Sequence, residues 1–229
     1  VGSEMCIRDS CPHCGGEAPL IKRRWLHKRK GKEPVAYRLK VDQAAKSYTV
    51  EILRGEAATQ DEPERGTMRG ATVECIYCGT PSERERIVEQ GQAGQMGQHL
   101  LVVVLYREGQ TGRDFRPATD ADRAAYARAT EKLAQAKAEG YDYWGFERLL
   151  SVVPNEPTPP SRARSISIRL YGITEWGHLF NERQALALIT FGQQIRTVRE
   201  LLAGEDDDYA RAIALFLSIL LSRYTVSYT

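Results

Sequence analysis

Two stretches decide the fold of this chain, Cys11-Pro12-His13-Cys14-Gly15-Gly16 and Cys75-Ile76-Tyr77-Cys78-Gly79. In each, two residues separate the cysteines, a spacing that lets both thiolates of one turn reach one metal ion. The Gly after the second Cys lets the turn close and backbone amides point at sulfur. Four thiolates from two such turns complete a tetrahedral zinc shell with no open position. The sequence therefore predicts one structural zinc ion bound by Cys11, Cys14, Cys75 and Cys78.

The alternatives to a zinc site are free thiols, disulfides and a redox motif. A thioredoxin-like pair lies between a strand and a helix of a βαβ unit, and neither pair here has that predicted context. Five cysteines in all, four of them at metal spacing, suit a reducing compartment, so we predict a cytoplasmic protein. His13 and His27 are possible substitute ligands, but four cysteines already fill the shell.

The composition is that of an ordinary globular chain with one or two domains. The 229 residues include 42% hydrophobic and 27% charged residues, and the net charge of +2 does not by itself select a partner. A bilayer span needs an apolar run of roughly 18 residues. The longest candidate, Ala212–Leu221, is much shorter, so no membrane association is predicted.

The residues between the two cysteine motifs are predicted to form a β insertion. Alternating and β-branched residues predict strands with a turn at Gln43–Lys46, and the polar residues after them, Ala57–Gly70, predict a mobile loop. A hairpin brings its two ends together, so the two motifs can meet across this insertion. The predicted strands are Leu20–Leu26, Val35–Asp42, Ser47–Leu53 and Ala71–Ile76.

The first part of this insertion is strongly basic. Between Leu20 and Lys40 nine residues are Lys or Arg and one, Glu33, is acidic. Basic side chains neutralise phosphates, and an aromatic side chain can stack on a base. The alternative is a solvated outer strand face, where Lys discourages aggregation. The candidate nucleic-acid contacts are Lys22, Arg23, Arg24, Trp25, Lys28, Arg29, Lys30 and Lys32.

The second half of the chain is predicted to be mainly helical. The apolar run His99–Tyr106 predicts one more buried strand, and Ser165–Leu170 alternates like another. Four prolines make Pro154–Ser161 an extended linker. Tyr209–Tyr224 is apolar nearly all round and should be fully buried. The predicted helices are Ser82–Gln90 with a capping box at its start, Asp120–Glu139, Glu182–Leu202 with Asn181 as N-cap and Gly204 as stop, and Tyr209–Tyr224.

The two ends of the sequence differ in character from the rest. Residues 1–10 resemble a translated sequencing-adapter read-through, and residues 226–229 resemble the start of its counterpart at C-termini. Both segments are therefore set aside from fold reasoning, and the chain is expected to be an internal fragment of a longer protein.

Several separated blocks resemble one protein type when they are taken together. The blocks are Cys11–Leu26, Gly70–Gly79, Gly91–Gly97 and Tyr171–Leu188. They resemble the large adenine-specific DNA methylases that carry an internal zinc ribbon, and the resemblance extends over residues 11–225.

The resemblance implies an S-adenosylmethionine-dependent parent enzyme that methylates the exocyclic amine of adenine in DNA. In that family a Phe-x-Gly-x-Gly cofactor motif precedes the ribbon and a catalytic Asp-Pro-Pro-Tyr motif follows the helices. Neither motif occurs here, so no catalytic or S-adenosylmethionine-binding residue is assigned and the chain alone is expected to be inactive. One alternative is a non-catalytic zinc-ribbon module that binds nucleic acid or a protein partner. Another is a purely structural role, in which zinc holds together an insertion that has too little core.

The expected fold class is α+β. A four-cysteine zinc ribbon with a β-hairpin insertion is followed by a mainly helical segment, as an incomplete piece of a larger α/β methyltransferase. The expected divisions are a tail at 1–10, a zinc-ribbon β domain at 11–106, a helix and linker at 107–160, a helical segment at 161–225 and a tail at 226–229. DNA and the missing N- and C-terminal parts of the same chain are the expected partners.

Overall fold

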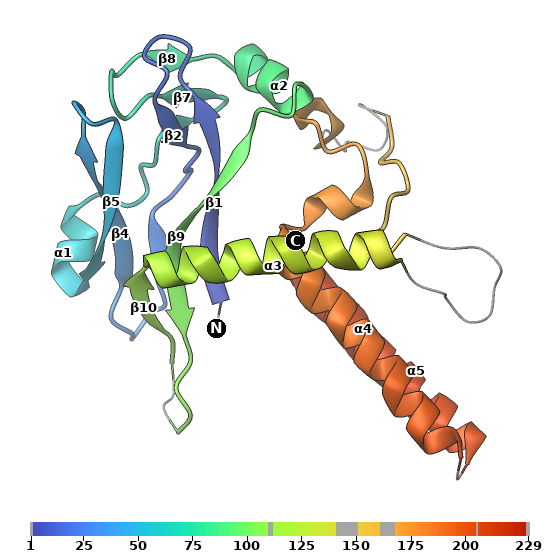
Figure 1. Ribbon diagram of the computed structural model, residues 1–229. Helices are drawn as coiled ribbons and strands as arrows, with labels where there is room; N and C mark the ends of the chain where they lie inside the picture. The colour runs from blue at the N-terminus through green and yellow to red at the C-terminus, as the bar shows by residue number, and fades with distance from the viewer. Residues whose placement is uncertain (1, 110–111, 141–150, 161–167, 205, 228–229) are drawn as a thin grey trace. The chain divides into compact units, whose positions relative to one another are not determined.

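The computed structural model describes residues 2–109, 112–140, 151–160, 168–204 and 206–227 (Figure 1). These residues belong to two compact units, one of Val1–Arg123 with Leu170–Gly172 and one of Ala124–Arg169 with Ile173–Thr229. The first unit contains small antiparallel sheets and the second contains helices, so the α+β class is confirmed.

The largest sheet of the first unit has four antiparallel strands around the predicted apolar strand β9. Leu101–Val104 in β9 are buried one after another. Adjacent residues of a strand point to opposite faces, so both faces of β9 are covered. In spatial order the strands are β10 (Asp114–Pro117), β9 (Gly97–Leu105), β1 (Gly2–Ser10) and β2 (Glu17–Pro19).

Strand β1 comes from the segment that sequence reasoning had left outside the fold. Ile7 pairs with Gln98 of β9, and Ser10 pairs with Glu17 of β2, so β1 lies inside the sheet. Excluding residues 1–10 from the fold was therefore wrong, whereas their origin stays a prediction. Because Ser10 leads directly into Cys11, β1 also positions the first cysteine turn.

The predicted β insertion forms a second sheet, β3 (Trp25–His27), β4 (Val35–Asp42) and β5 (Ser47–Arg54). The register runs from Val35 opposite Arg54 to Asp42 opposite Ser47, which confirms the predicted turn at 43–46. Asp42 closes this turn by accepting a hydrogen bond from the Ala45 amide at 2.9 Å. Strand β3 begins at Trp25 and not at Leu20, because the backbone before it bonds to the segment after α1: the Arg24 amide donates to the Pro63 carbonyl and the Ile21 carbonyl accepts from the Met68 amide.

The segment that was predicted to be a mobile loop begins as a helix, α1 (Gly55–Gln60). Ala58 of α1 is fully buried against Ala36 and Leu53, so burial of one small face fixes the helix. Gly55 is its first residue and has φ of +60°, which a residue with a side chain rarely adopts.

A third sheet carries the second cysteine motif. It contains three very short strands, β6 (Met68–Arg69), β7 (Thr72–Glu74) and β8 (Pro81–Ser82), followed by α2 (Arg84–Gln92). The predicted capping box at Ser82 was wrong, because Ser82 is a buried β8 residue and Glu83 precedes the helix without a side-chain cap. Gly91–Gly97 forms the end of α2 and the connection to β9.

The core of the first unit lies between its two larger sheets. Tyr37 of β4 packs with Val102 and Val104 of β9 and with Phe115 of β10. Ile21 joins the same cluster from the segment between β2 and β3. A polar link runs beside this core, where the Tyr48 hydroxyl and His99 Nδ1 are 2.5 Å apart and His99 Nε2 is 3.4 Å from Glu17.

The second unit is built on three long helices, α3 (Asp120–Glu139, in this unit from Ala124), α4 (Glu182–Ala203) and α5 (Asp207–Ser227). Leu133 of α3, Val153 and Ala185 of α4 form its small core. As predicted, Asn181 caps α4 and Gly204 follows its end. The cap is a reciprocal capping box with Gln184. A short 3₁₀-helix, η3 (Trp176–Leu179), precedes α4.

The proline-rich segment that begins at Pro154, predicted to be an extended linker, is bonded to the rest of the second unit. Pro157 forms a β-bridge with Glu175, and the Thr158 side chain is buried and donates a hydrogen bond to the Ile173 carbonyl at 2.8 Å. The first half of the strand predicted at Ser165–Leu170 lies outside the described residues. Its described end belongs to a short 3₁₀-helix, η2 (Ile168–Tyr171), so that part was wrong.

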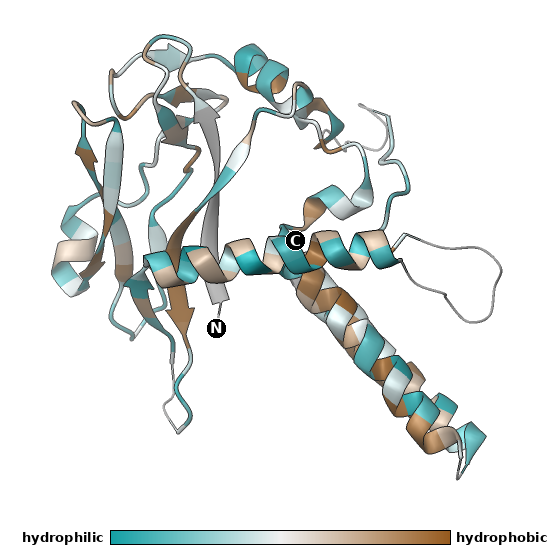
Figure 2. Cartoon of the chain, viewed as in Figure 1, coloured by the Kyte–Doolittle hydropathy of each residue, from teal (hydrophilic) through white to brown (hydrophobic). Residues whose placement is uncertain are grey.

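Helix α5 was predicted to be fully buried, and in this chain it is not. It packs along α4 (Figure 1), yet Leu215, Phe216 and Ile219 are about three-fifths exposed, at 64%, 62% and 59%. Apolar residues occur along both helices of this pair (Figure 2). Together they present more apolar surface than a single helix–helix contact buries. Among the described helices none combines the length and apolar character that a membrane crossing requires.

Candidate metal centre

The two cysteine motifs fold into two equivalent turns. The Gly15 amide donates to the Cys11 carbonyl at 2.8 Å, and the Gly79 amide donates to the Cys75 carbonyl at 2.9 Å. Gly15 and Gly79 have φ of +70° and +71°, which is why Gly follows the second Cys in each motif. The predicted amide-to-sulfur contact is present in the first turn, where the Gly16 amide lies 3.4 Å from the Cys14 sulfur.

Hydrogen bonds bring the two turns together across the long insertion. The Thr67 hydroxyl accepts from the Ile21 amide at 2.8 Å and donates to the Pro19 carbonyl at 2.6 Å. The Met68 amide donates to the Ile21 carbonyl at 2.9 Å, and the Tyr77 hydroxyl donates to the Glu17 carbonyl at 3.1 Å. The chain leaving the first turn is thus joined to the chain entering the second.

The four sulfur atoms lie where one tetrahedral ion would need them. All four lie within 4.8 Å of one another, and two pairs that cross between the turns, Cys11–Cys78 and Cys14–Cys75, are 3.7 Å apart. A zinc–sulfur bond of about 2.3 Å in tetrahedral geometry places ligand sulfurs about 3.8 Å apart. A disulfide would need about 2.05 Å, so the arrangement fits a shared cation and not a disulfide. Four cysteines would fill all four positions of a tetrahedral ion, as in the shell of a structural site.

The surroundings make the four thiols unequal. Cys11 and Cys75 are buried against Tyr77, and desolvation raises the pKa of both, that of Cys75 to about 12. Cys78 is exposed, and hydrogen bonds from the Thr80 hydroxyl and amide lower its pKa to about 6. Thiols this close cannot all ionise without a cation, and a bound divalent ion would hold all four as thiolates.

The candidate nucleic-acid residues divide into two groups, and Arg24 belongs to the group with structural partners. Its guanidinium pairs with Asp61 and donates to the carbonyls of Asp61, Arg65 and Tyr37. The Arg24 and Asp61 side chains are both only 16% exposed. Arg24 therefore braces β4 against the chain that follows α1, and its guanidinium is already saturated.

Glu64 engages three more of the predicted basic and aromatic contacts. It accepts from Trp25 Nε1 at 3.0 Å and from Lys28 Nζ at 2.5 Å, and it lies 3.5 Å from Arg23. These donors lower the pKa of Glu64, with Lys28 the largest cause. Lys28 Nζ also lies 4.7 Å from the centroid of the Trp25 ring, so a cation already occupies that face of the ring.

The other group is exposed and has no ion pair or side-chain hydrogen bond to any described residue. Its members are Lys22, Arg29, Lys30 and Lys32. The last three lie on the turn between β3 and β4, which we call the basic turn, residues 28–34. Of the residues singled out in the sequence, these keep their charges available to a phosphate.

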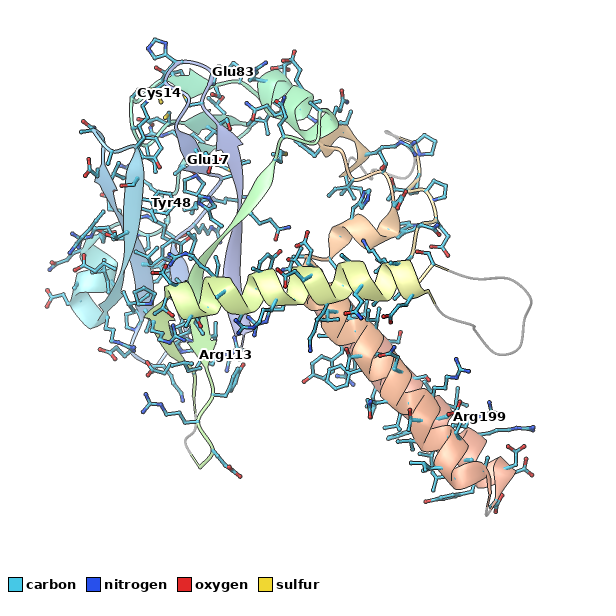
Figure 3. All side chains as sticks on the ribbon, in the orientation of Figure 1. Cys14, Glu17, Tyr48, Glu83, Arg113 and Arg199 are labelled. Carbon is cyan, nitrogen blue, oxygen red and sulfur yellow. The ribbon has the colours of Figure 1, made fainter. Side chains whose placement is uncertain are left out.

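The metal centre and the basic turn lie at opposite ends of the β4–β5 hairpin. Lys46, in the turn that closes this hairpin, donates to the Cys14 carbonyl at 2.5 Å, whereas the basic turn precedes Val35 at the open end. Eight residues of strand separate the two ends by roughly 25 Å. Cys14, labelled in Figure 3, marks the end that carries the metal centre. A zinc ion at the cysteines would therefore stabilise the fold of the first unit and would not contact a ligand bound to the basic turn.

Sequence reasoning missed the residues that support the cysteine turns. Thr67 and Tyr77 act through backbone carbonyls far away in sequence, for which a single sequence has no signal. Thr80 could have been found, because it stands two residues after Cys78, as Gly16 stands after Cys14, at the position whose amide points at sulfur.

Comparison with known proteins identifies no relative: no family model, no curated protein and no solved structure matches this chain.

Proposed function

We propose that Cys11, Cys14, Cys75 and Cys78 bind one structural Zn²⁺ that joins the two cysteine turns and stabilises the first unit. The observation that carries this proposal is the 3.7 Å spacing of sulfur pairs that cross between the turns. The short strands of the third sheet add a reason. Two- and three-residue strands form few ladder hydrogen bonds, so a cross-link must hold them.

Metal content tests the zinc proposal. Protein purified under reducing conditions should contain about one zinc per chain by mass spectrometry of the intact native protein. Cobalt in place of zinc should show the intense thiolate-to-metal absorption of a four-sulfur site. Cys75→Ser should lose the metal, whereas Cys6→Ser, a substitution of the fifth cysteine, should keep it. A chain that contains no metal, or that loses it equally in both variants, would contradict the site.

We further propose that this zinc-braced unit binds DNA through the basic turn. Arg29, Lys30 and Lys32 support this, since they are exposed and have no carboxylate partner among the described residues. The resemblance to adenine-specific DNA methylases supports placing the unit in an S-adenosylmethionine-dependent parent enzyme that acts in the cytoplasm. There it would position DNA while cofactor binding and methyl transfer take place elsewhere. A protein partner in place of DNA is the second candidate, favoured by the exposed apolar face of α5.

Salt dependence tests the DNA proposal. Each phosphate contact releases counterions, so three contacts should weaken duplex binding roughly forty-fold between 50 and 200 mM salt. Fluorescence anisotropy with a labelled duplex measures this. The triple variant Arg29→Glu, Lys30→Glu, Lys32→Glu should abolish binding.

A matched triple variant on α3 provides the control for charge alone. This variant combines Arg128→Glu, Lys132→Glu and Lys137→Glu, which make the same charge change at exposed positions. It should bind the duplex nearly as well as the unsubstituted chain. An equal loss of duplex affinity in both triple variants, or no duplex binding by the unsubstituted chain, would contradict DNA binding through the basic turn. Binding of S-adenosylmethionine by the chain, measured by calorimetry, would contradict the placement of the cofactor site elsewhere.

A further inference from the structure

The fold brings a second segment, far away in sequence, to the same end of the first unit as the basic turn. The Gly55 amide donates to the Pro34 carbonyl at 2.9 Å, so the end of β5 lies beside the basic turn. From there Arg54 reaches Asp114 of β10 at 2.6 Å and the Phe115 carbonyl at 3.4 Å. The β9–β10 hairpin therefore extends from the end of the unit that carries the basic turn (Figure 1).

The base of that hairpin carries an exposed aromatic ring beside an arginine. Leu105 pairs with Asp114 at the end of the ladder, and Tyr106 and Arg113 are the next residues on the two arms. Tyr106 is 59% exposed, and the Arg113 guanidinium lies 5.7 Å from the centroid of its ring. Trp25, in contrast, packs against Ala36 and is capped by Lys28. A cation lies over each of the two rings, but Tyr106 is exposed whereas Trp25 is half-buried, so Tyr106 presents ring surface to solvent that Trp25 does not.

The charges at this end leave the arginine of the hairpin available. The acidic residues of the basic turn, of residues 54–56 and of residues 105–114 are Glu33, Glu56, Glu108 and Asp114. Asp114 is held by Arg54 at 2.6 Å and by Arg107 at 3.4 Å, and the Phe115 amide together with these donors lowers its pKa. Glu56 accepts from Gln60 at 2.9 Å. Arg113 forms no ion pair with any described carboxylate, so it can pair with a phosphate or stack on a base.

We propose that Tyr106 and Arg113 form a base-stacking platform that extends the basic turn into a site for single-stranded nucleic acid. This rests on the proposed DNA binding and names its form: phosphates contact Arg29, Lys30 and Lys32, and an unpaired base stacks on Tyr106. Stacking needs only the π-face that every base has, so the platform is tolerant of sequence. A paired base keeps its neighbours and cannot use the ring, so the platform selects unpaired over duplex nucleic acid.

The test uses the zinc-loaded full chain and two labelled oligonucleotides, a dT20 single strand and a duplex of equal length. Anisotropy titrations at fixed salt should show tighter binding of the single strand. Tyr106→Ala should weaken single-strand binding by about tenfold, a typical loss for removing one stacked aromatic, and change duplex binding little. Tyr106→Phe keeps the ring and should bind like the parent chain. Arg113→Ala should weaken single-strand binding more than duplex binding.

Two control variants separate stacking from general surface effects. Tyr209→Ala removes a tyrosine of nearly equal exposure, 56%, from α5 of the second unit and should leave both affinities unchanged. Arg128→Ala removes an exposed arginine from α3 and should likewise leave both affinities unchanged. Circular dichroism and zinc content should be unchanged in every variant, because Tyr106 and Arg113 lie outside the buried core.

The outcomes distinguish this inference from the proposed function. The unsubstituted chain can bind DNA through the basic turn while Tyr106→Ala binds the single strand as well as Tyr209→Ala does. That result overturns the stacking platform and leaves the proposed DNA binding intact. Equal affinity of the parent chain for single strand and duplex also overturns the platform. If the parent chain binds neither oligonucleotide, both proposals fail together. Selective loss of single-strand affinity, retained by Tyr106→Phe, is the supporting result.

Discussion

The two units of this chain show contrasting ways of reaching a stable fold. The first unit contains many short strands, some of only two residues, joined by the cysteine turns and by buried polar braces such as Arg24 and Asp61. The second unit is built on helices of about 20 residues, and much of α5 is exposed. A helix satisfies its backbone hydrogen bonds within itself, whereas a two-residue strand depends entirely on its neighbours. The first unit therefore needs cross-links that the second does not.

Removing zinc should have the largest effect and should separate the two units most clearly. Structural zinc contributes on the order of 10 kcal/mol in small zinc-dependent folds, so a chelator should unfold the first unit. Hydrogen–deuterium exchange should show loss of protection in β4 and β5 while α4 keeps its own. Simultaneous loss of protection in β4 and α4, or no loss in β4, would show that the contrast between the units is wrong.

Breaking the Arg24–Asp61 brace should have the next largest effect. Asp61 accepts from Arg24 and lies 2.9 Å from Arg38, and its side chain is largely buried. Asp61→Ala leaves the Arg24 guanidinium with carbonyl partners only, which should cost roughly 2–3 kcal/mol of the free energy of unfolding. Urea denaturation of the zinc-loaded protein measures it. Glu62→Ala, at a neighbouring carboxylate that is 65% exposed, should change the free energy by less than about 0.5 kcal/mol.

A hydrogen bond between α3 and α4 gives the second unit a predicted alkaline response. The Tyr126 hydroxyl donates a hydrogen bond to Glu182. The pKa of Tyr126 is raised, mainly by desolvation and secondly by the Glu182 carboxylate. Tyr126→Phe should lower the free energy of unfolding by about 1–2 kcal/mol near pH 8.

The raised pKa fixes the sign of the pH dependence. In the folded state Tyr126 stays neutral above its ordinary pKa of about 10, so its stabilisation is complete below pH 10 and is lost as the pH rises further. The gap between the parent chain and Tyr126→Phe should therefore close above pH 10, as followed by helical circular dichroism during denaturation. A gap that widens with pH would show that the Tyr126–Glu182 bond is not formed.

The smallest effect is expected on the exposed face of α5. Phe216→Ser should change the free energy of unfolding by less than about 0.5 kcal/mol, because Phe216 is already 62% exposed. Leu217→Ala, at the half-buried neighbouring position, should cost roughly 1–2 kcal/mol. Denaturation midpoints of the two variants test this. A cost at Phe216 as large as that at Leu217 would indicate that this face is covered in solution.

The sequence by itself determined the features that depend on near neighbours. The cysteine spacing predicted the four ligands, because two residues between cysteines and a following Gly define the turn locally. Alternation over Val35–Asp42 and the β-branched residues of Ser47–Leu53 predicted the β4–β5 hairpin, and Asn181 was predicted as the N-cap of α4. These signals lie within a few residues of one another, at the distances where periods of 2 and 3.6 operate.

Only the tertiary structure decided which of these elements meet. It placed β1 inside a sheet, because pairing with β9 depends on a partner about ninety residues away. It used Arg24 as a brace, capped Trp25 with Lys28, and left the basic turn and Tyr106 at one end of the unit. It also left α5 exposed where its apolar sequence predicted burial. Burial and partnership are properties of long-range contacts, which a local pattern cannot specify.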